Sequence, residues 1–184
     1  MTQFLFLSIL LTVSICWVAA LVSFLLPQHR IWPPMSPKSW KYWIVWPTSI
    51  YAKLTIPFLA FFDKNSLNTF QHHSLISGIA LALLIGGAVF AIMSAKKLSP
   101  TQTTGLKGTL RTTGPYKLSR NPQYVGVIIF LMGLTIFSDS YLVLLVSLVY
   151  TSWYIFLPFV EEPWMKAQYG KLYEDYCKKV SRFL

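Results

Sequence analysis

Two short polar motifs carry the residue types in this sequence that could bind a charged small molecule. The first is Arg120-Asn121-Pro122, a permanent cation followed by the two residues that favour a helix start, asparagine as N-cap and proline at the first helical position. A helix that begins there directs its free amide donors and partial positive charge toward Arg120, so the two together could bind an anion. The second motif is Glu161-Glu162, two carboxylates that could receive an ammonium group.

Each motif also has a simpler explanation. Arg120 could be a topology anchor or a ligand for lipid phosphate at the membrane surface. Pro163 could begin a further helix, and Glu162 would then stabilise the N-terminus of that helix. Taken together, however, an anion site and a cation site at the two ends of one helical hairpin fit a zwitterion. S-adenosylmethionine has an amino-acid head group, with a sulfonium and an adenine that suit aromatic neighbours.

The composition indicates that these motifs belong to a membrane protein. The chain has 184 residues, of which 54% are hydrophobic and only 12% are charged, whereas soluble domains are about 25% charged. A net charge of +10 would suggest nucleic-acid binding in a soluble protein. Here the basic residues lie in short loops and in the tail, where they set orientation in the membrane. We therefore expect an all-α integral membrane protein that binds no nucleic acid.

Apolar runs of about 20 residues, enough to cross a bilayer, predict about five transmembrane helices in a single domain. Three form an N-terminal part, residues 1–97, and two form a hairpin within the cofactor-binding part, residues 98–184. The tight turn of that hairpin is predicted at Ser138–Ser140. The expected spans are Phe4–Leu26 (a retained helix and not a signal peptide), Trp43–Phe62 with Pro47, Lys53 and Pro57 inside it, Ser74–Ala95 with close packing at Gly78, Gly86 and Gly87, and the two halves of Val125–Val160.

Basic residues alternate between the connections of these spans. They are frequent after the first and third spans and in the tail, and scarce elsewhere, which predicts an outside N-terminus and a cytoplasmic C-terminus. The short chain and the R-N-P sequence favour a prokaryotic cytoplasmic membrane. Apolar residues recur at helical spacing from Met165 to Val180, which predicts an amphipathic helix on the cytoplasmic side. His72 and His73 fall in an outer loop and are expected at the surface.

The polar motifs, taken in order, resemble the isoprenylcysteine carboxyl methyltransferase family and the wider group that contains the phospholipid N-methyltransferases. The resemblance rests on "GPY" at 114–116, "RNPQYVG" at 120–126, "EE" at 161–162 and "VSR" at 180–182. It implies an integral membrane methyltransferase that binds S-adenosylmethionine at the cytoplasmic face, needs no metal, and takes a lipophilic, small or lipidated substrate from the bilayer. Arg120 and Glu162 would be the catalytic pair. The implied cofactor-binding residues are Gly114, Tyr116, Arg120, Asn121, Pro122, Tyr124, Glu161 and Glu162.

Departures from the family pattern leave the methyl acceptor open. Asn121 stands where eukaryotic members carry histidine, and Phe156-Leu157-Pro158 replaces an arginine found a turn before the glutamates. The missing arginine weakens the case for a prenylcysteine carboxylate. A prenylated cysteine, a phospholipid amine, a small thiol and an isoprenoid or quinone-like acceptor all stay open.

Two other functions remain as alternatives. Sterol-reductase-like membrane enzymes, which use NADPH, share a similar R-x-P-x-Y-x-G and tail pattern, and a small membrane scaffold would use the polar patch for a partner protein. A soluble-type methyltransferase does not fit, because no G-x-G-x-G follows a predicted strand. The sequence sets no oligomeric state.

Overall fold

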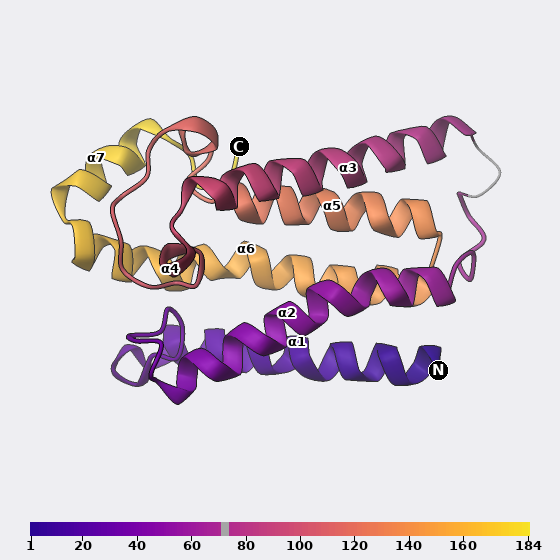
Figure 1. Cartoon of the computed structure of the whole chain (residues 1–184), viewed down its shortest axis with the longest axis horizontal. Helices are drawn as coiled ribbons and strands as arrows, with labels where there is room; N and C mark the ends of the chain where they lie inside the picture. The colour runs from indigo at the N-terminus through magenta and orange to yellow at the C-terminus, as the bar shows by residue number, and fades with distance from the viewer. Residues whose placement is uncertain (71–73) are drawn as a thin grey trace.

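The protein is a bundle of long helices, described by a computed structural model for residues 1–70 and 74–184, apart from the side chains of residues 100 and 101 (Figure 1). The long helices are α1 (Thr2–Leu25), α2 (Trp40–Phe62), α3 (Ser74–Lys97), α5 (Pro122–Ser138) and α6 (Tyr141–Tyr169). The short ones are η1 (Pro27–His29), α4 (Pro100–Thr103), η2 (Gly114–Lys117) and α7 (Lys171–Lys179). The predicted all-α class is confirmed, and His72 and His73 lie outside the described residues.

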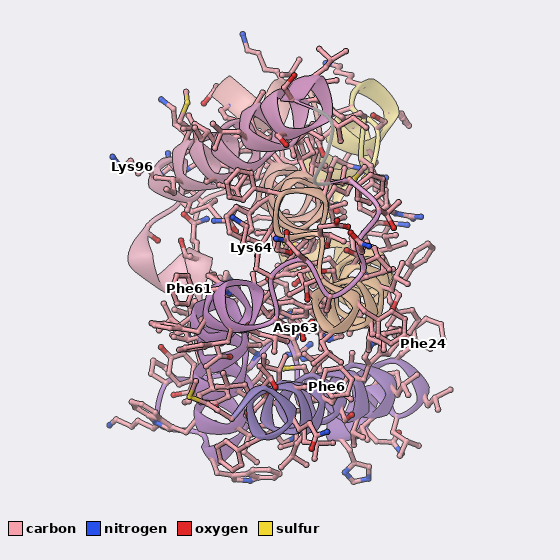
Figure 2. The ribbon with its side chains drawn as sticks, turned by 90° about the vertical axis from the view of Figure 1, so that its right-hand side faces the viewer. Phe6, Phe24, Phe61, Asp63, Lys64 and Lys96 are labelled. Carbon is pink, nitrogen blue, oxygen red and sulfur yellow. The ribbon has the colours of Figure 1, made fainter. Side chains whose placement is uncertain are left out.

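Four helices, α1, α2, α3 and α6, are long and apolar enough to cross a membrane. The fifth predicted span, α5, is apolar but has only 17 residues. At about 1.5 Å per residue it reaches about 26 Å, close to the roughly 30 Å of a bilayer core. Large apolar side chains point away from the bundle, as Phe24 and Phe61 do on opposite sides in Figure 2. Lipid contact accounts for this exposure, since lipid tails are as apolar as these side chains.

The helices divide into two groups that meet at α6. Helix α3 packs along α5, and α5 packs on α6, while α1 and α2 pack on each other and on the other side of α6 (Figure 1). Side chains of α6 such as Tyr150 and Leu157 are therefore fully buried at the centre of the core.

Small residues let α3 and α5 come into close contact. A Cβ added at Gly87 or Gly133 would lie 2.3 Å from a backbone nitrogen of the other helix, and one added at Gly126 would lie 2.5 Å from such an atom. The packing role predicted for Gly87 is confirmed. For Gly78 and Gly86 it is wrong, because both face open space within this chain.

The predicted hairpin turn at Ser138–Ser140 is confirmed, and it is tied to the loop that follows α2. Asp139 adopts the left-handed conformation that ends α5, with φ of 50°. Its buried carboxylate accepts hydrogen bonds from the backbone N–H groups of Thr69 and Phe70, at 2.8 and 3.0 Å. Ser140 caps α6 by accepting from the N–H of Val143. One aspartate therefore holds two chain segments together.

We expect Asp139→Ala to lower the free energy of unfolding by about 2 kcal/mol, because two part-buried N–H groups lose a charged acceptor that is itself buried. Thermal denaturation in detergent measures the loss. The matched control is Asp175→Ala, since Asp175 pairs only with Lys178 on the exposed face of α7, and exposed pairs contribute about 0–1 kcal/mol. Equal stability of the two variants would contradict a structural role for Asp139.

The loops that are rich in Lys and Arg meet at one end of the bundle, called here the basic end. It carries the loop after α1, the segment 98–121 and the tail with α7 (Figure 1). Lys64 is the only Lys or Arg among the described residues at the opposite end, which Figure 2 faces. The alternation predicted from the sequence is thus present in the fold. The two polar motifs also lie at the basic end.

The tail differs from the sequence prediction in one respect. Pro163 does not begin a new helix, because α6 continues through Pro158 and Pro163 to Tyr169. The break comes at Gly170, where φ is +52°, a conformation that glycine adopts without steric cost. The predicted amphipathic helix is therefore the shorter α7, with Tyr173 buried and the neighbouring Leu172 exposed. Both glutamates lie within α6 and not at its end.

Candidate functional site

A cavity at the basic end brings together most of the residues predicted from the sequence. It lies between α5, α6, α7 and the 98–113 segment, with about 880 Å³ of empty space that includes space open to solvent. Gly114 and Pro122 are not among its lining residues; Gly114 supplies the turn before Tyr116 and Pro122 is buried at the start of α5. The predicted residues that line it are Tyr116, Arg120, Asn121, Tyr124, Glu161 and Glu162.

The carboxylate of Glu161 lines this basic-end cavity and lies between two hydrogen-bond donors. Its Oε1 accepts a hydrogen bond from the indole N–H of Trp32, at 2.6 Å, and another from the hydroxyl of Tyr124. No described residue donates to Oε2 of Glu161. The charge of this carboxylate has no cation paired with it among the described residues, as the three ion pairs involve other groups. Oε2 of Glu161 is thus an acceptor without a donor among the described residues, and no described cation pairs with the carboxylate.

Glu162 is in the opposite situation, because two arginines surround it. Arg182 donates to both of its oxygens, from Nε to Oε1 and from Nη2 to Oε2, each at 2.8 Å. Arg120 adds an ion pair, with Nη2 3.3 Å from Oε1. The hydrogen bonds to Glu162 raise the pKa of Arg182, whose guanidinium also lies 4.1 Å from the centre of the Phe159 ring. Paired bonds of this kind fix geometry as well as charge.

The C-terminal segment is fastened to the start of α5 by these same residues. The backbone N–H of Arg120 donates to Ser181 O at 3.0 Å, and Asn121 Nδ2 donates to Arg182 O, also at 3.0 Å. Asn121 is indeed the residue before α5, as predicted, but its side chain makes no capping hydrogen bond. Its amide instead positions the chain at Arg182. The last residues therefore form one wall of the site.

Aromatic side chains form much of the rest of the cavity. Tyr176 donates its hydroxyl to Tyr116 O at 2.6 Å, and burial raises the pKa of Tyr176 to about 12. Tyr169 donates to Gly108 O at 2.7 Å, which holds the segment 98–113 over the site. The Arg30 guanidinium lies 5.9 Å from the ring centre of Trp164. Such a lining suits a ligand that has a flat ring and a cation.

Sequence reasoning missed two residues that shape the site. Trp32 lies far from the motifs along the chain, in the loop after α1, and only its place in "WPP" between two spans marked it as unusual. Arg182 belongs to the tail pattern, but its pairing with Glu162 joins positions 20 residues apart. The charge of a buried carboxylate at the basic end was the available signal that an arginine must lie nearby.

Comparison with models of known protein families gave one match. A family model described as phospholipid methyltransferase matches residues 75–172, more than half of the chain. The chain belongs to the phospholipid methyltransferase family. The matched segment runs from α3 to the start of α7 and contains Arg120, Tyr124 and both glutamates. Searches of curated proteins and of solved structures each found no match.

Membership in the phospholipid methyltransferase family confirms the resemblance seen in the motifs. The match begins before Gly114, where the first of these motifs begins, and so includes the helix that packs on α5. Trp32 and Arg182, which contact the two glutamates, lie outside the matched segment. Together with the apolar helices, the family indicates a membrane methyltransferase.

Proposed function

We propose that this protein is an S-adenosylmethionine-dependent methyltransferase that binds its cofactor in the basic-end cavity and acts on a lipophilic acceptor from the bilayer. The observation that carries the proposal concerns Glu161, whose carboxylate faces the cavity. One of its oxygens is held by Trp32 and Tyr124, and the other has no donor among the described residues. An ammonium group is the natural partner for such an oxygen.

The polar groups of the cavity fit the cofactor's head group. Oε2 of Glu161 would receive the ammonium, and Arg120, at the N-terminus of α5, would receive the carboxylate. Tyr116 and Tyr173 would lie beside the sulfonium and the adenine. When bound, S-adenosylmethionine supplies a methyl group on a sulfonium, which an acceptor can take by in-line displacement.

In this proposal the side chains of the protein contribute by positioning the cofactor. Glu162 and Arg182 hold Arg120 in position, so that Glu162 acts through the arginine. Placement of this kind can supply about 7–11 kcal/mol of a reaction barrier. The hydroxyl of Tyr124 donates a hydrogen bond to Glu161 and so orients the carboxylate. We propose no essential proton shuttle, and a bell-shaped pH profile that one substitution abolishes would count against this.

The basic end would face the cytoplasm of a prokaryotic cell in this proposal, with the N-terminus outside. Support comes from the positive-inside rule, since Lys64 is the only Lys or Arg among the described residues at the opposite end. The cofactor would then be reached from the cytoplasm and the acceptor from the membrane.

Calorimetry with the purified protein in detergent tests the proposal. We expect micromolar binding of S-adenosylmethionine and S-adenosylhomocysteine, weakened at least about tenfold in Arg120→Ala, since hydrogen bonds to charged groups contribute about 1.5–3 kcal/mol. Lys117→Ala is the matched control, because this exposed cation at the same end does not line the cavity. Folded wild-type protein that bound NADPH and not S-adenosylmethionine would reject the methyltransferase and favour a reductase.

A further inference from the structure

A second cavity adjoins the cofactor site from the bilayer side. This bilayer cavity lies between α2, α3, α5 and α6 and has about 830 Å³ of empty space, including open space. It shares Trp32, Gln123 and Tyr124 with the basic-end cavity, so the two are neighbours. A third cavity, with about 560 Å³ of empty space including open space, continues from Lys53 between apolar side chains such as Ile56 and Phe130. The three form a series from the basic end into the apolar interior.

Most polar side chains around the bilayer cavity already have partners within the chain. Tyr124 and Trp32 donate to Glu161, Ser49 pairs with the Tyr150 hydroxyl, and the Trp153 indole donates to Cys16 O. Three hydrogen-bond donors have no such partner among the described residues. The indole N–H of Trp46 is buried without a hydrogen-bond partner, and neither the Gln123 amide nor the Lys53 ammonium has a hydrogen bond or ion pair to any described residue.

Lys53 directs its ammonium into this cavity and not toward the nearer end of its helix. It lies nine residues before the end of α2 at Phe62 and thirteen after its start at Trp40. A lysine that merely sought water would extend toward Phe62. Instead Nζ lies 5.5 Å from the ring centre of Trp46, seven residues toward the basic end. Side chains lean toward the N-terminus of their helix, which favours this direction.

The bilayer cavity therefore holds a cation and further donors without a matching anion. Of the described residues that line it, none is acidic. A charge inside a membrane normally has a partner, and such residues mark binding sites or pathways. The described lining residues supply no anion here, and an anionic ligand would supply it. One cation matches one negative charge, and the apolar cavity beyond Lys53 matches a hydrocarbon chain.

We propose that the bilayer cavity binds a membrane-dissolved monoanion, a single-chain lipophile whose carboxylate lies at Lys53 within reach of Trp46 and Gln123. Its hydrocarbon chain occupies the apolar cavity beside Ile56. The carboxylate end then faces Tyr124 and the cofactor site, which makes this the binding site of the methyl acceptor. That last role rests on the proposed function, whereas the binding itself does not.

Equilibrium binding of oleate and of oleyl alcohol to the whole protein in nanodiscs tests this inference, at neutral pH and without S-adenosylmethionine. We expect the wild type to bind oleate at least about tenfold more tightly than the alcohol, as a charged hydrogen bond allows. Lys53→Gln should remove the preference, and Lys53→Arg should keep it. Lys64→Gln, at the opposite end, is the matched control. Equal binding of both probes by the wild type, or an unchanged preference in folded Lys53→Gln, would overturn the inference.

The same samples separate this inference from the proposed function. Calorimetry with S-adenosylmethionine reports on the basic-end cavity alone. An oleate preference that depends on Lys53, without cofactor binding, would support the lipid site and reject the methyltransferase. Cofactor binding without an oleate preference would overturn the lipid site alone.

Discussion

Glu161→Gln is expected to weaken S-adenosylmethionine binding by at least about 100-fold. Glutamine keeps the shape and can still accept from Trp32 and Tyr124, but it removes the charge that the ligand ammonium needs. Truncating one partner of a buried charge pair costs about 2–5 kcal/mol, and about 3 kcal/mol corresponds to that factor. Calorimetry in detergent measures the change. Glu174→Gln on the exposed face of α7 is the matched control and should bind as the wild type does.

The substitution Glu162→Gln distinguishes the role of Glu162 from that of Glu161. We expect a smaller loss of cofactor binding, about tenfold, because Glu162 acts by holding Arg120 and Arg182. Thermal stability should fall together with binding, since the C-terminal segment loses its anchor. If Glu162→Gln abolished binding while Glu161→Gln did not, the ammonium site would belong to Glu162, and Arg182 would have to leave it when the ligand binds.

Gly133→Leu is expected to prevent normal packing of α3 on α5 and to destabilise the protein by about 3 kcal/mol or more. The first added carbon would already lie 2.3 Å from Leu84 N and 2.8 Å from Ala80 O. These are backbone atoms, so the two helices must separate. Because α5 begins at the cofactor site, Arg120 would move with it. Thermal denaturation in detergent and the yield of monodisperse protein measure the effect.

Gly86→Leu provides the matched control for this substitution. Gly86 lies in α3, but an added carbon there would meet nothing within 4 Å. The leucine would face lipid, where an apolar side chain costs little. We expect wild-type stability, and similar losses at Gly86 and Gly133 would show that leucine acts through some general effect on helix insertion.

The order and approximate bounds of the helices followed from the sequence alone. Inside a bilayer every backbone polar group must be satisfied within the chain, so a long apolar run can only be a helix. Local chemistry likewise determined where α5 starts, at Asn121-Pro122, and where the hairpin turns, at Asp139. The motifs also indicated Arg120 and the glutamate pair, because charged residues beside apolar spans are expensive unless they have a function.

The tertiary structure alone decided what each of these groups touches. Periodicity does not say that Glu161 meets Trp32 from the first loop, or that Arg182 reaches Glu162 across 20 residues. Pro163 suggested the start of a further helix, which did not occur, because α6 continues through Pro163 to Tyr169. In the sequence, Lys53 was only a charged residue inside a predicted span. In the structure, α2 places its ammonium in a cavity that no described acidic residue lines. The physical reason is common to all four cases. Helix formation depends on neighbours along the chain, whereas the partner of a charge depends on which helix faces meet in space.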